Sequence, residues 1–240
     1  MGLKKLPISF RKVLNWLKWG ILLFFGLSIL STILFAFIPV PFTPLMGIRA
    51  TQQLIDGKEV AVYKQWVPIE KISPHLQLAV VCAEDQKYLD HFGFDVDAIK
   101  KALDHNKESK RVRGASTISQ QTAKNLFLWP GRSWIRKGME VYFTLLIEAF
   151  WSKERILEVY LNVAEMGNGV YGAEAASLYY YGKNADKLTR QQAALLAACL
   201  PSPRKYSPVK PSRYISGRQN WILRQMRYWG SSSLFDEKKD

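Results

Sequence analysis

The feature that most constrains this chain is an uninterrupted apolar run near its N-terminus. From Trp19 to Val40 the sequence reads WGILLFFGLSILSTILFAFIPV and holds no charged residue. A helix of about 22 residues, rising about 1.5 Å per residue, spans the roughly 30 Å hydrocarbon core of a bilayer. The run also lacks the polar stripe of a helix at the surface of a soluble core. It predicts a transmembrane helix over residues 19–40.

A cleaved secretory signal is the main alternative for this run. The apolar part of such a signal is about 7–15 residues long and ends in small residues. The run here is longer and ends in the bulky residues Phe37-Ile38-Pro39-Val40. We therefore expect an anchor that is not cleaved.

The charges before the run predict its orientation. No acidic residue precedes it, and five basic residues do: Lys4, Lys5, Arg11, Lys12 and Lys18. By the positive-inside rule, residues 1–18 form a cytoplasmic basic segment and everything after Val40 lies outside.

The exported part is also basic. The chain has 34 Lys and Arg against 20 Asp and Glu, a formal charge of +14, and +9 remains without the five N-terminal cations. Such a domain beside a membrane is expected to meet anionic partners such as lipid head groups, diphosphates or acidic polymers. Nucleic acid is not expected, because an extracytoplasmic domain rarely meets it. A charge that only aids solubility stays an alternative.

The cysteines and histidines give no sign of a disulfide framework or a metal site. Cys82 and Cys199 each lie in an apolar stretch, and we expect small buried thiols rather than a disulfide framework. The three histidines are scattered and do not have the spacing of zinc ligands.

Residues 41–72 are predicted to form a connector, with a turn at Asp56-Gly57 and a short strand in which Val60 and Val62 alternate. Residues 73–230 are predicted to form one helical domain, which begins with a Ser73 N-cap and a Pro74 at the first helical position. A tail follows at 231–240.

Within this domain, helices are expected at 117–128, 134–151, 153–163, 171–180 and 189–199. The last begins with a capping box formed by Thr189 and Gln192. The basic stretch 100–113 is expected to end in a mobile loop. Prolines at 201, 203, 208 and 211 are expected to end regular structure near the C-terminus.

The first segment that could carry chemistry is LQLAVVCAEDQKYLDHFGFD. Glu84 and Asp85 point about 100° apart on a helix, so only one of them can face a given cleft. If the helix continues, Tyr88 and His91 lie on the face of Glu84, at i+4 and i+7. A carboxylate near an apolar surface can have a raised pKa and act as a general acid or base. An ordinary solvated helix end is the structural alternative.

The second segment, GASTISQQTAKN, opens a helix with small and hydroxyl residues, and the free N–H groups of a helix start suit an anion. Thr117, Gln121 and Lys124 lie at i, i+4 and i+7, so a hydroxyl, an amide and a cation line one face. This combination suits a sugar or a phosphate better than a core. A capped surface helix is the structural alternative.

The third segment, RSWIRKGME, places Glu140 at i+4 from Arg136 and i+3 from Lys137. These residues form either a helical salt bridge or an acid among cations that hold a diphosphate. The fourth segment, KERILEVYLN, is an amphipathic helix whose default interpretation is packing, and catalysis by Glu154 or Glu158 is not expected.

Taken together, in this order and spacing, the four segments resemble the peptidoglycan glycosyltransferases of family 51. The matching stretches cover most of residues 76–208 and include AEDQKYLDHFGFD, RGASTISQQTAKNLFL, IRKGMEVYF, SKERILEVYLN and GVYGAEAASLYYYGKNADKLTRQQAALLAACLPSPRKYSP. The resemblance implies a mainly α fold, with a single lysozyme-like α-helical glycosyltransferase domain on one N-terminal transmembrane helix. The chain resembles the monofunctional members of this family, so no transpeptidase domain is expected.

The chain departs from the family pattern at three positions, none of which removes a catalytic group. Tyr88 stands where Phe is usual, Ala115 replaces the second Gly of a Gly-Gly-Ser-Thr run, and Gln192 replaces a usual Glu.

The resemblance implies that lipid II, a lipid-linked disaccharide pentapeptide, is polymerised into β-1,4-linked glycan strands of the bacterial cell wall. Polyprenyl diphosphate would be released and the anomeric carbon would invert. Glu84 would be the general base, and Glu140 the second acidic residue, which orients cations or helps the leaving group depart. The residues expected to bind substrate are Asp85, Tyr88, His91, Thr117, Gln121, Lys124, Asn125, Arg136 and Lys137.

The same resemblance implies the partners and the location. Lipid II, the growing lipid-linked glycan, the membrane and other cell-wall synthesis proteins are the expected partners. The expected location is the bacterial inner membrane, with a single pass and the catalytic domain on the outer, periplasmic face. No cofactor is required by the sequence, although Mg²⁺ or Mn²⁺ on the substrate diphosphate suits hard-cation chemistry.

Two other functions remain as alternatives. A lysozyme-like glycan hydrolase also needs a glutamate in a cleft, but it needs no cluster of cations opposite that glutamate. A non-catalytic membrane-anchored scaffold would tolerate the loss of Glu84, Lys124 and Glu140.

Overall fold

The computed structural model describes residues 10–109, 114–131, 133–229 and 234–235. The chain divides into two compact units, Met1–Ile38 and Pro39–Asp240. The first unit contains helix α1 (Phe10–Phe37), and the second contains the remaining elements.

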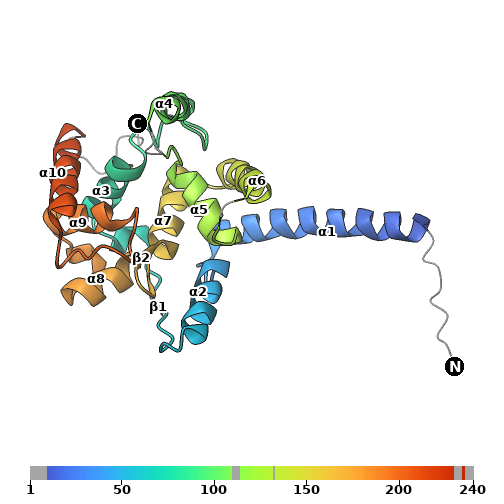
Figure 1. Ribbon diagram of the computed structural model, residues 1–240, viewed down its shortest axis with the longest axis horizontal. Helices are drawn as coiled ribbons and strands as arrows, with labels where there is room; N and C mark the ends of the chain where they lie inside the picture. Colours follow the sequence, from blue (N-terminus) through green and yellow to red (C-terminus); the bar gives the residue numbers. More distant parts are fainter. Residues whose placement is uncertain (1–9, 110–113, 132, 230–233, 236–240) are drawn as a thin grey trace. The chain divides into compact units, whose positions relative to one another are not determined.

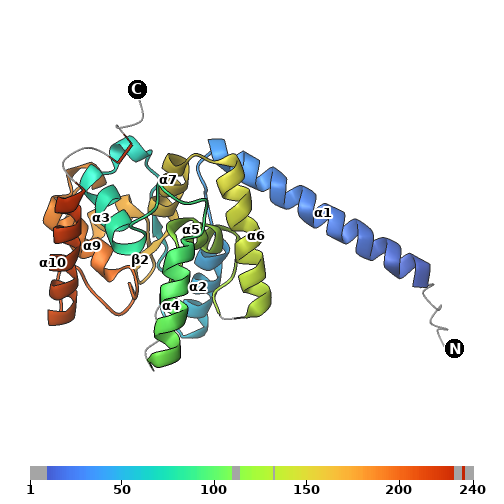
Figure 2. The same ribbon diagram turned by 90° about the horizontal axis from the view of Figure 1, so that it is seen from above.

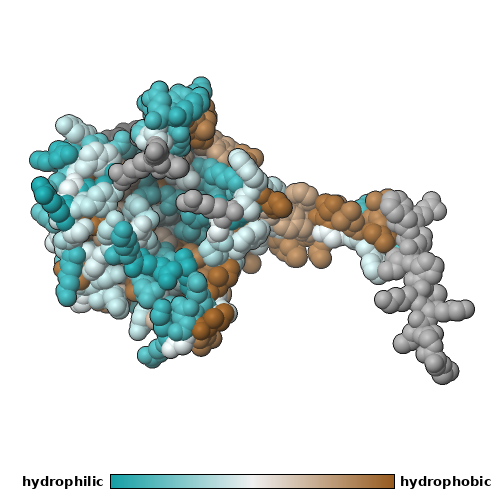
Figure 3. All heavy atoms as spheres, viewed as in Figure 1, coloured by the Kyte–Doolittle hydropathy of each residue, from teal (hydrophilic) through white to brown (hydrophobic). Residues whose placement is uncertain are grey.

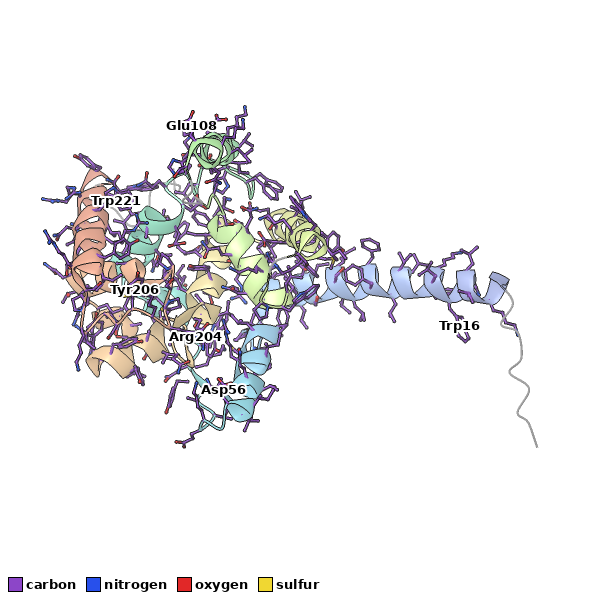
Figure 4. All side chains as sticks on the ribbon, viewed as in Figure 1. Trp16, Asp56, Glu108, Arg204, Tyr206 and Trp221 are labelled. Carbon is purple, nitrogen blue, oxygen red and sulfur yellow. The ribbon has the colours of Figure 1, made fainter. Side chains whose placement is uncertain are left out.

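Helix α1 is long and apolar enough to cross a membrane: within its Lys12–Phe37 span, an 18-residue window has a mean hydropathy of 2.4. Its surface is largely hydrophobic in Figure 3, and Figure 4 labels Trp16 near its start. The predicted run 19–40 extends past the end of the helix, because Pro39 disfavours a helical conformation at the residue before it. The expected apolar helix is therefore present and begins earlier than predicted.

The second unit is mainly α, as predicted. Among the described residues it holds nine α-helices: α2 (Pro44–Ile55), α3 (Pro74–Glu84), α4 (Val96–Glu108), α5 (Ile118–Phe127), α6 (Trp134–Phe150), α7 (Lys153–Val163), α8 (Ala173–Tyr181), α9 (Arg190–Cys199) and α10 (Arg213–Tyr228). Helices α3, α9 and α10 form one group, and α5 packs against α6 and α7 to form another (Figures 1 and 2).

Helix α3 lies at the centre of the first group. All its residues from Leu76 to Cys82 are buried, as expected of a helix that is apolar on every side. The Ser73 side chain caps its start, as predicted, and also donates to the carbonyl of Leu188. A buried, doubly anchored helix therefore carries Glu84 as its last residue.

A small sheet of three strands lies beside α8. Strand β3 (Val170–Tyr171) is central, parallel to β1 (Tyr63–Lys64) and antiparallel to β2 (Glu165–Gly167). Gly169 has a φ of +73°, and a Cβ there would collide with the carbonyl oxygen of Ala61. Only glycine accepts both conditions without strain.

The helices predicted between residues 117 and 199 are confirmed by α5 to α9, each within two residues at either end. The capping box of Thr189 and Gln192 is present at the start of α9. Cys82 and Cys199 are free and buried, as predicted.

Three helices were not predicted. Helix α2 lies within the expected connector, and that stretch is also tied to α7, because Asn162 Nδ2 donates to Val67 O and Val67 N donates to Asn162 Oδ1. Helix α4 occupies the basic stretch before Ser109, and residues 110–113, where the loop was expected, lie outside the described residues. The tail 231–240 also lies outside them, apart from 234–235.

The prediction that the C-terminal prolines end regular structure is wrong, because α10 follows them. Ser212 caps this helix by accepting from the Ile215 N–H. Its apolar face, formed by Ile215, Ile222 and Met226, is buried in the group with α3 and α9. A new cap and a buried stripe thus restart a helix immediately after Pro211.

Candidate functional site

Two adjoining hollows lie in the second unit and share Ser116, Gln121 and Pro201. The first, the cationic hollow, has a volume of about 530 Å³, and its polar lining includes Arg49, Gln121, Lys124, Asn125, Arg136, Lys137, Glu140, Tyr160 and Glu165. The second, the Glu84 hollow, has a volume of about 820 Å³, and its lining includes Glu84, Asp85, Asp95, His105, Thr117, Gln121, Tyr214, Arg218 and Trp221. Figure 4 labels Trp221 on α10 and Arg204 in the loop after α9.

Glu84 presents a carboxylate to the Glu84 hollow. Gln121 Nε2 donates to its Oε2 over 2.7 Å. Burial raises the pKa of Glu84, while the hydrogen bond from Gln121 and the positive charges of Arg218 and Lys124 act against this rise. A carboxylate whose pKa lies above its usual value is suited to take a proton from a hydroxyl near neutral pH.

Three cations surround one carboxylate in the cationic hollow. Arg136 Nη1 donates to Glu140 Oε2 over 2.9 Å, and Lys137 Nζ donates to Glu140 Oε1 over 2.5 Å. Arg136 and Lys137 lie four and three residues before Glu140, as expected from the sequence. Lys124 on α5 interacts electrostatically with Arg136, Lys137 and Glu140. Arg49 and Glu165 also line this hollow, so four cations face two carboxylates; the hollow therefore stays positive and suits an anion such as a diphosphate.

The protonation of Lys124 depends on what enters the hollow. Burial lowers the pKa of Lys124; Glu140 and Glu84 oppose this effect, and Arg136 and Lys137 add to it. An anion bound beside Lys124 would favour its charged form, because an opposite charge nearby raises the pKa of an ammonium group.

The start of α5 does hold an anion, but the anion is Asp85 of the chain itself. Asp85 Oδ2 accepts from the N–H of Ile118 over 3.0 Å, and the Asp85 carboxylate pairs with His91 Nε2 over 2.9 Å. Thr117 caps α5 and donates its hydroxyl to the carbonyl of Gly93 over 2.7 Å. Asp85 and Thr117 border the Glu84 hollow, but their polar groups already hold the backbone around it.

The expectation that Tyr88 and His91 share the face of Glu84 is wrong, because α3 ends at Glu84 and the helix does not continue. Tyr88 is fully buried and donates its hydroxyl to the carbonyl of Lys153 over 2.5 Å. His91 contacts Asp85 instead of entering the hollow. Tyr88 therefore ties the segment after α3 to the start of α7, and His91 holds the Asp85 carboxylate within that segment.

Because Asp85 holds the backbone, Asp85→Ala is expected to lower stability rather than to weaken substrate binding alone. The loss of a buried carboxylate that accepts from Ile118 and His91 should cost about 3 kcal/mol. Thermal unfolding of the full chain in detergent, followed by circular dichroism, measures this loss.

Asp104→Ala is the control for Asp85→Ala, because Asp104 forms an exposed ion pair with Lys107. A pair of this kind is worth roughly 0.5 kcal/mol or less. An Asp85→Ala protein with an unchanged melting temperature and a raised KM would show that Asp85 is a substrate ligand.

The structure adds residues that the sequence patterns did not single out. Tyr160 lines the cationic hollow from α7, in a segment that was assigned to packing. Arg218 donates to the carbonyl of Ala83 over 2.8 Å and lines the Glu84 hollow, but it lies on α10, which was not predicted. At the other end of the cationic hollow, Arg49 Nε lies 3.6 Å from Glu165 Oε2. Local spacing carries no signal for these residues.

The described side chains do not form a binding site that would by itself coordinate a divalent metal ion. In the described part of the chain, no three His, Cys, Asp or Glu side chains gather in a way that could hold a metal ion. Both oxygens of Glu140, the acidic group beside the three cations, are engaged by Arg136 and Lys137. The ammonium groups of Lys124 and Lys137 and the guanidinium group of Arg136 also line this hollow.

The fold and the site together define a class of enzyme. A half-buried carboxylate in one hollow can deprotonate a nucleophile, and a cluster of cations in the next can stabilise a phosphate-bearing leaving group. An anchor-like apolar helix precedes this domain. These are the parts of a transferase that moves a group from a phosphate-linked donor.

The chain belongs to the transglycosylase family, whose family model matches residues 51–227. It is 52% identical over 220 residues to a biosynthetic peptidoglycan transglycosylase of Bacteroides thetaiotaomicron, which covers 92% of this chain and 89% of the relative. It is 53% identical over 212 residues to a protein of the same name from Bdellovibrio bacteriovorus, with 88% and 85% covered. One from Pseudomonas putida is 51% identical over 228 residues, with 95% of each chain covered. The family predicted from the motifs and the glycosyltransferase class are thus confirmed.

Proposed function

We propose that this protein polymerises lipid II into β-1,4-linked glycan strands of the cell wall. The donor is the growing strand, linked through a diphosphate to a polyprenyl lipid, and the acceptor is a lipid II molecule. The 4-hydroxyl oxygen of the acceptor attacks the anomeric carbon of the donor, and polyprenyl diphosphate leaves. A single displacement inverts this carbon. The names of the relatives support this substrate.

In this proposal Glu84 takes the proton of the acceptor 4-hydroxyl. Glu84 is half-buried, faces its hollow and accepts a hydrogen bond from Gln121, which keeps its carboxylate oriented. The acceptor sugar would lie in the Glu84 hollow.

The diphosphate of the donor would lie in the cationic hollow. Lys124, Arg136 and Lys137 meet the charge that grows on the leaving diphosphate, and a shielded cleft strengthens such interactions. Glu140 touches both Arg136 and Lys137, so its role is to orient these cations. Gln121 and Ser116 line both hollows and therefore lie where the two substrates would meet.

The observation that carries this proposal is the adjacency of the two hollows: the Glu84 carboxylate faces one, and Lys124, Arg136 and Lys137 line the other. A glycan hydrolase of the usual kind works with two carboxyl groups that flank the scissile bond. Here the second carboxylate, Glu140, is held by two cations, and this arrangement favours transfer from a diphosphate over hydrolysis.

The membrane placement is part of the proposal. Both substrates carry a lipid, and an anchor confines the search for them to the membrane surface. The five basic residues before the apolar run 19–40 favour a cytoplasmic N-terminus, with residues 73–230 as the catalytic domain outside the inner membrane.

Incubation of the detergent-solubilised full chain with radiolabelled lipid II tests the proposal. The expected product is a polymer that muramidase degrades. Release of fragments from finished cell wall, with no polymer from lipid II, would favour the hydrolase. Neither product from a folded protein would favour the scaffold.

A further inference from the structure

Tyr160 and Glu84 are joined by a hydrogen-bonded chain that runs through Gln121. The hydroxyl of Tyr160 donates to Gln121 Oε1 over 3.3 Å, and Gln121 Nε2 donates to Glu84 Oε2 over 2.7 Å. The three residues come from α7, α5 and α3, so the chain connects the two helix groups. Tyr160 is 1% exposed, and water has little access to replace its hydroxyl.

The direction of donation in this chain matters because an ionised carboxylate only accepts hydrogen bonds. Gln121 must therefore turn its NH₂ group toward Glu84, which directs its carbonyl oxygen toward Tyr160. Without a donor at residue 160, this oxygen of the half-buried Gln121 side chain loses its protein partner, and the orientation that serves the carboxylate becomes less favourable. Successive donations also polarise one another and strengthen the last bond.

We propose that Tyr160 is a positioning residue for the general base: its hydroxyl fixes the amide of Gln121 so that the N–H groups face the Glu84 carboxylate. This inference rests on the proposed role of Glu84. Tyr160 stays protonated and so remains a donor, because burial, with the nearby charge of Glu84, raises the pKa of its hydroxyl well above the usual value.

Other charged groups also act on Glu84. Asp85 adjoins it, Lys124 approaches from α5, and Arg218 approaches from α10. Asp95 and His105 line the same hollow. None of these groups takes part in the chain from Tyr160, so a change confined to the Tyr160 hydroxyl leaves them in place.

The test is the pH dependence of kcat for Tyr160→Phe, measured with the full chain in detergent and radiolabelled lipid II. The base works only when it is deprotonated, so the rate rises with pH through the pKa of Glu84. A weaker hydrogen bond from Gln121 raises this pKa further. The acidic limb of the pH profile of kcat should therefore shift to higher pH by about 0.5–1 pH unit. At higher pH the kcat should recover to within about threefold of wild type, because the residues that meet the substrates are intact.

Tyr171→Phe is the matched control, because Tyr171 is also fully buried and its hydroxyl has no hydrogen-bond partner among the described residues. Its pH profile should equal that of wild type. Gln121→Met should move the limb at least as far as Tyr160→Phe does. Adding Tyr160→Phe to Gln121→Met should move it no further, since the two residues act through one chain.

Two results would overturn the inference. One is an unmoved acidic limb in Tyr160→Phe, and the other is a uniform loss of rate at every pH, which would mean a packing role only. If Tyr160→Phe does not fold, 4-fluorophenylalanine at position 160 fills the volume without donating, and 4-aminophenylalanine should restore the wild-type limb. Glu84→Gln tests the proposed function separately from the role of Tyr160. Full activity in that variant would refute Glu84 as the general base, whatever the result for Tyr160→Phe.

Discussion

Glu84→Gln is expected to lower the rate of lipid II polymerisation by a factor of about 10²–10⁴, the usual contribution of a general base. Glutamine has nearly the same shape and can still accept the hydrogen bond from Gln121, so the fold should be kept. It cannot take the proton of the attacking hydroxyl. The measurement is the yield of muramidase-sensitive polymer per unit time from radiolabelled lipid II.

Glu154→Gln is the matched control for this change. It alters the same functional group at an exposed position on the first turn of α7, outside both hollows. Its rate should equal that of wild type. A Glu84→Gln protein that retained more than about a tenth of the wild-type rate would remove Glu84 from the role of base.

The wild-type pH profile should carry the mark of the same residue. Burial raises the pKa of Glu84, so the acidic limb of kcat should lie above the value of about 4.3 of a free glutamate. Activity should fall as the pH drops through this limb, because the protonated carboxyl cannot act as a base.

Lys124→Met is expected to lower kcat by a factor of about 10²–10³, the cost of removing one group that stabilises developing charge. Methionine keeps most of the length of the side chain and removes the ammonium group. Arg136 and Lys137 remain, but both are already held by Glu140, which draws their charge to one side of the hollow. Steady-state kinetics with lipid II separates kcat from KM.

Lys107→Met is the control for Lys124→Met, because Lys107 lies at the surface in an exposed pair with Asp104. It should leave both parameters unchanged. A raised KM with an unchanged kcat in Lys124→Met would mean that this lysine binds ground state and transition state equally, and the proposed role in leaving-group departure would fail.

Much of the secondary structure could be predicted because its signals are local. Ser73, Thr117 and Thr189 cap the helices they precede, and each cap is set by residues three or fewer positions away. Glu140 contacts Arg136 and Lys137 because they lie one turn before it on α6. The three unpredicted helices also begin with capping side chains, Thr43, Asp95 and Ser212, so their local signals were present and were overlooked. The apolar face of α10 is buried in the group with α3 and α9.

The roles of the residues around Glu84 could not be predicted from spacing. Helical periodicity placed Tyr88 and His91 beside Glu84, but the chain turns at Asp85, whose carboxylate holds the start of a helix 33 residues further on. The contact between Tyr160 and Gln121 joins residues 39 positions apart, and that between Arg218 and Ala83 joins residues 135 apart. No local pattern encodes these distances.

The sequence by itself therefore determined the apolar helix, the caps, the helices from α5 to α9, the cation pairs with Glu140 and the family of the chain. Each of these depends on neighbours within a turn or two, or on motifs of a dozen residues. Only the tertiary structure decided that Asp85, Thr117 and Tyr88 bond to backbone groups and that His91 pairs with Asp85. It also decided that Glu84, Gln121 and Lys124 line the hollows. The reason is physical: a buried polar group must find a partner, and which partner it finds depends on how distant helices pack.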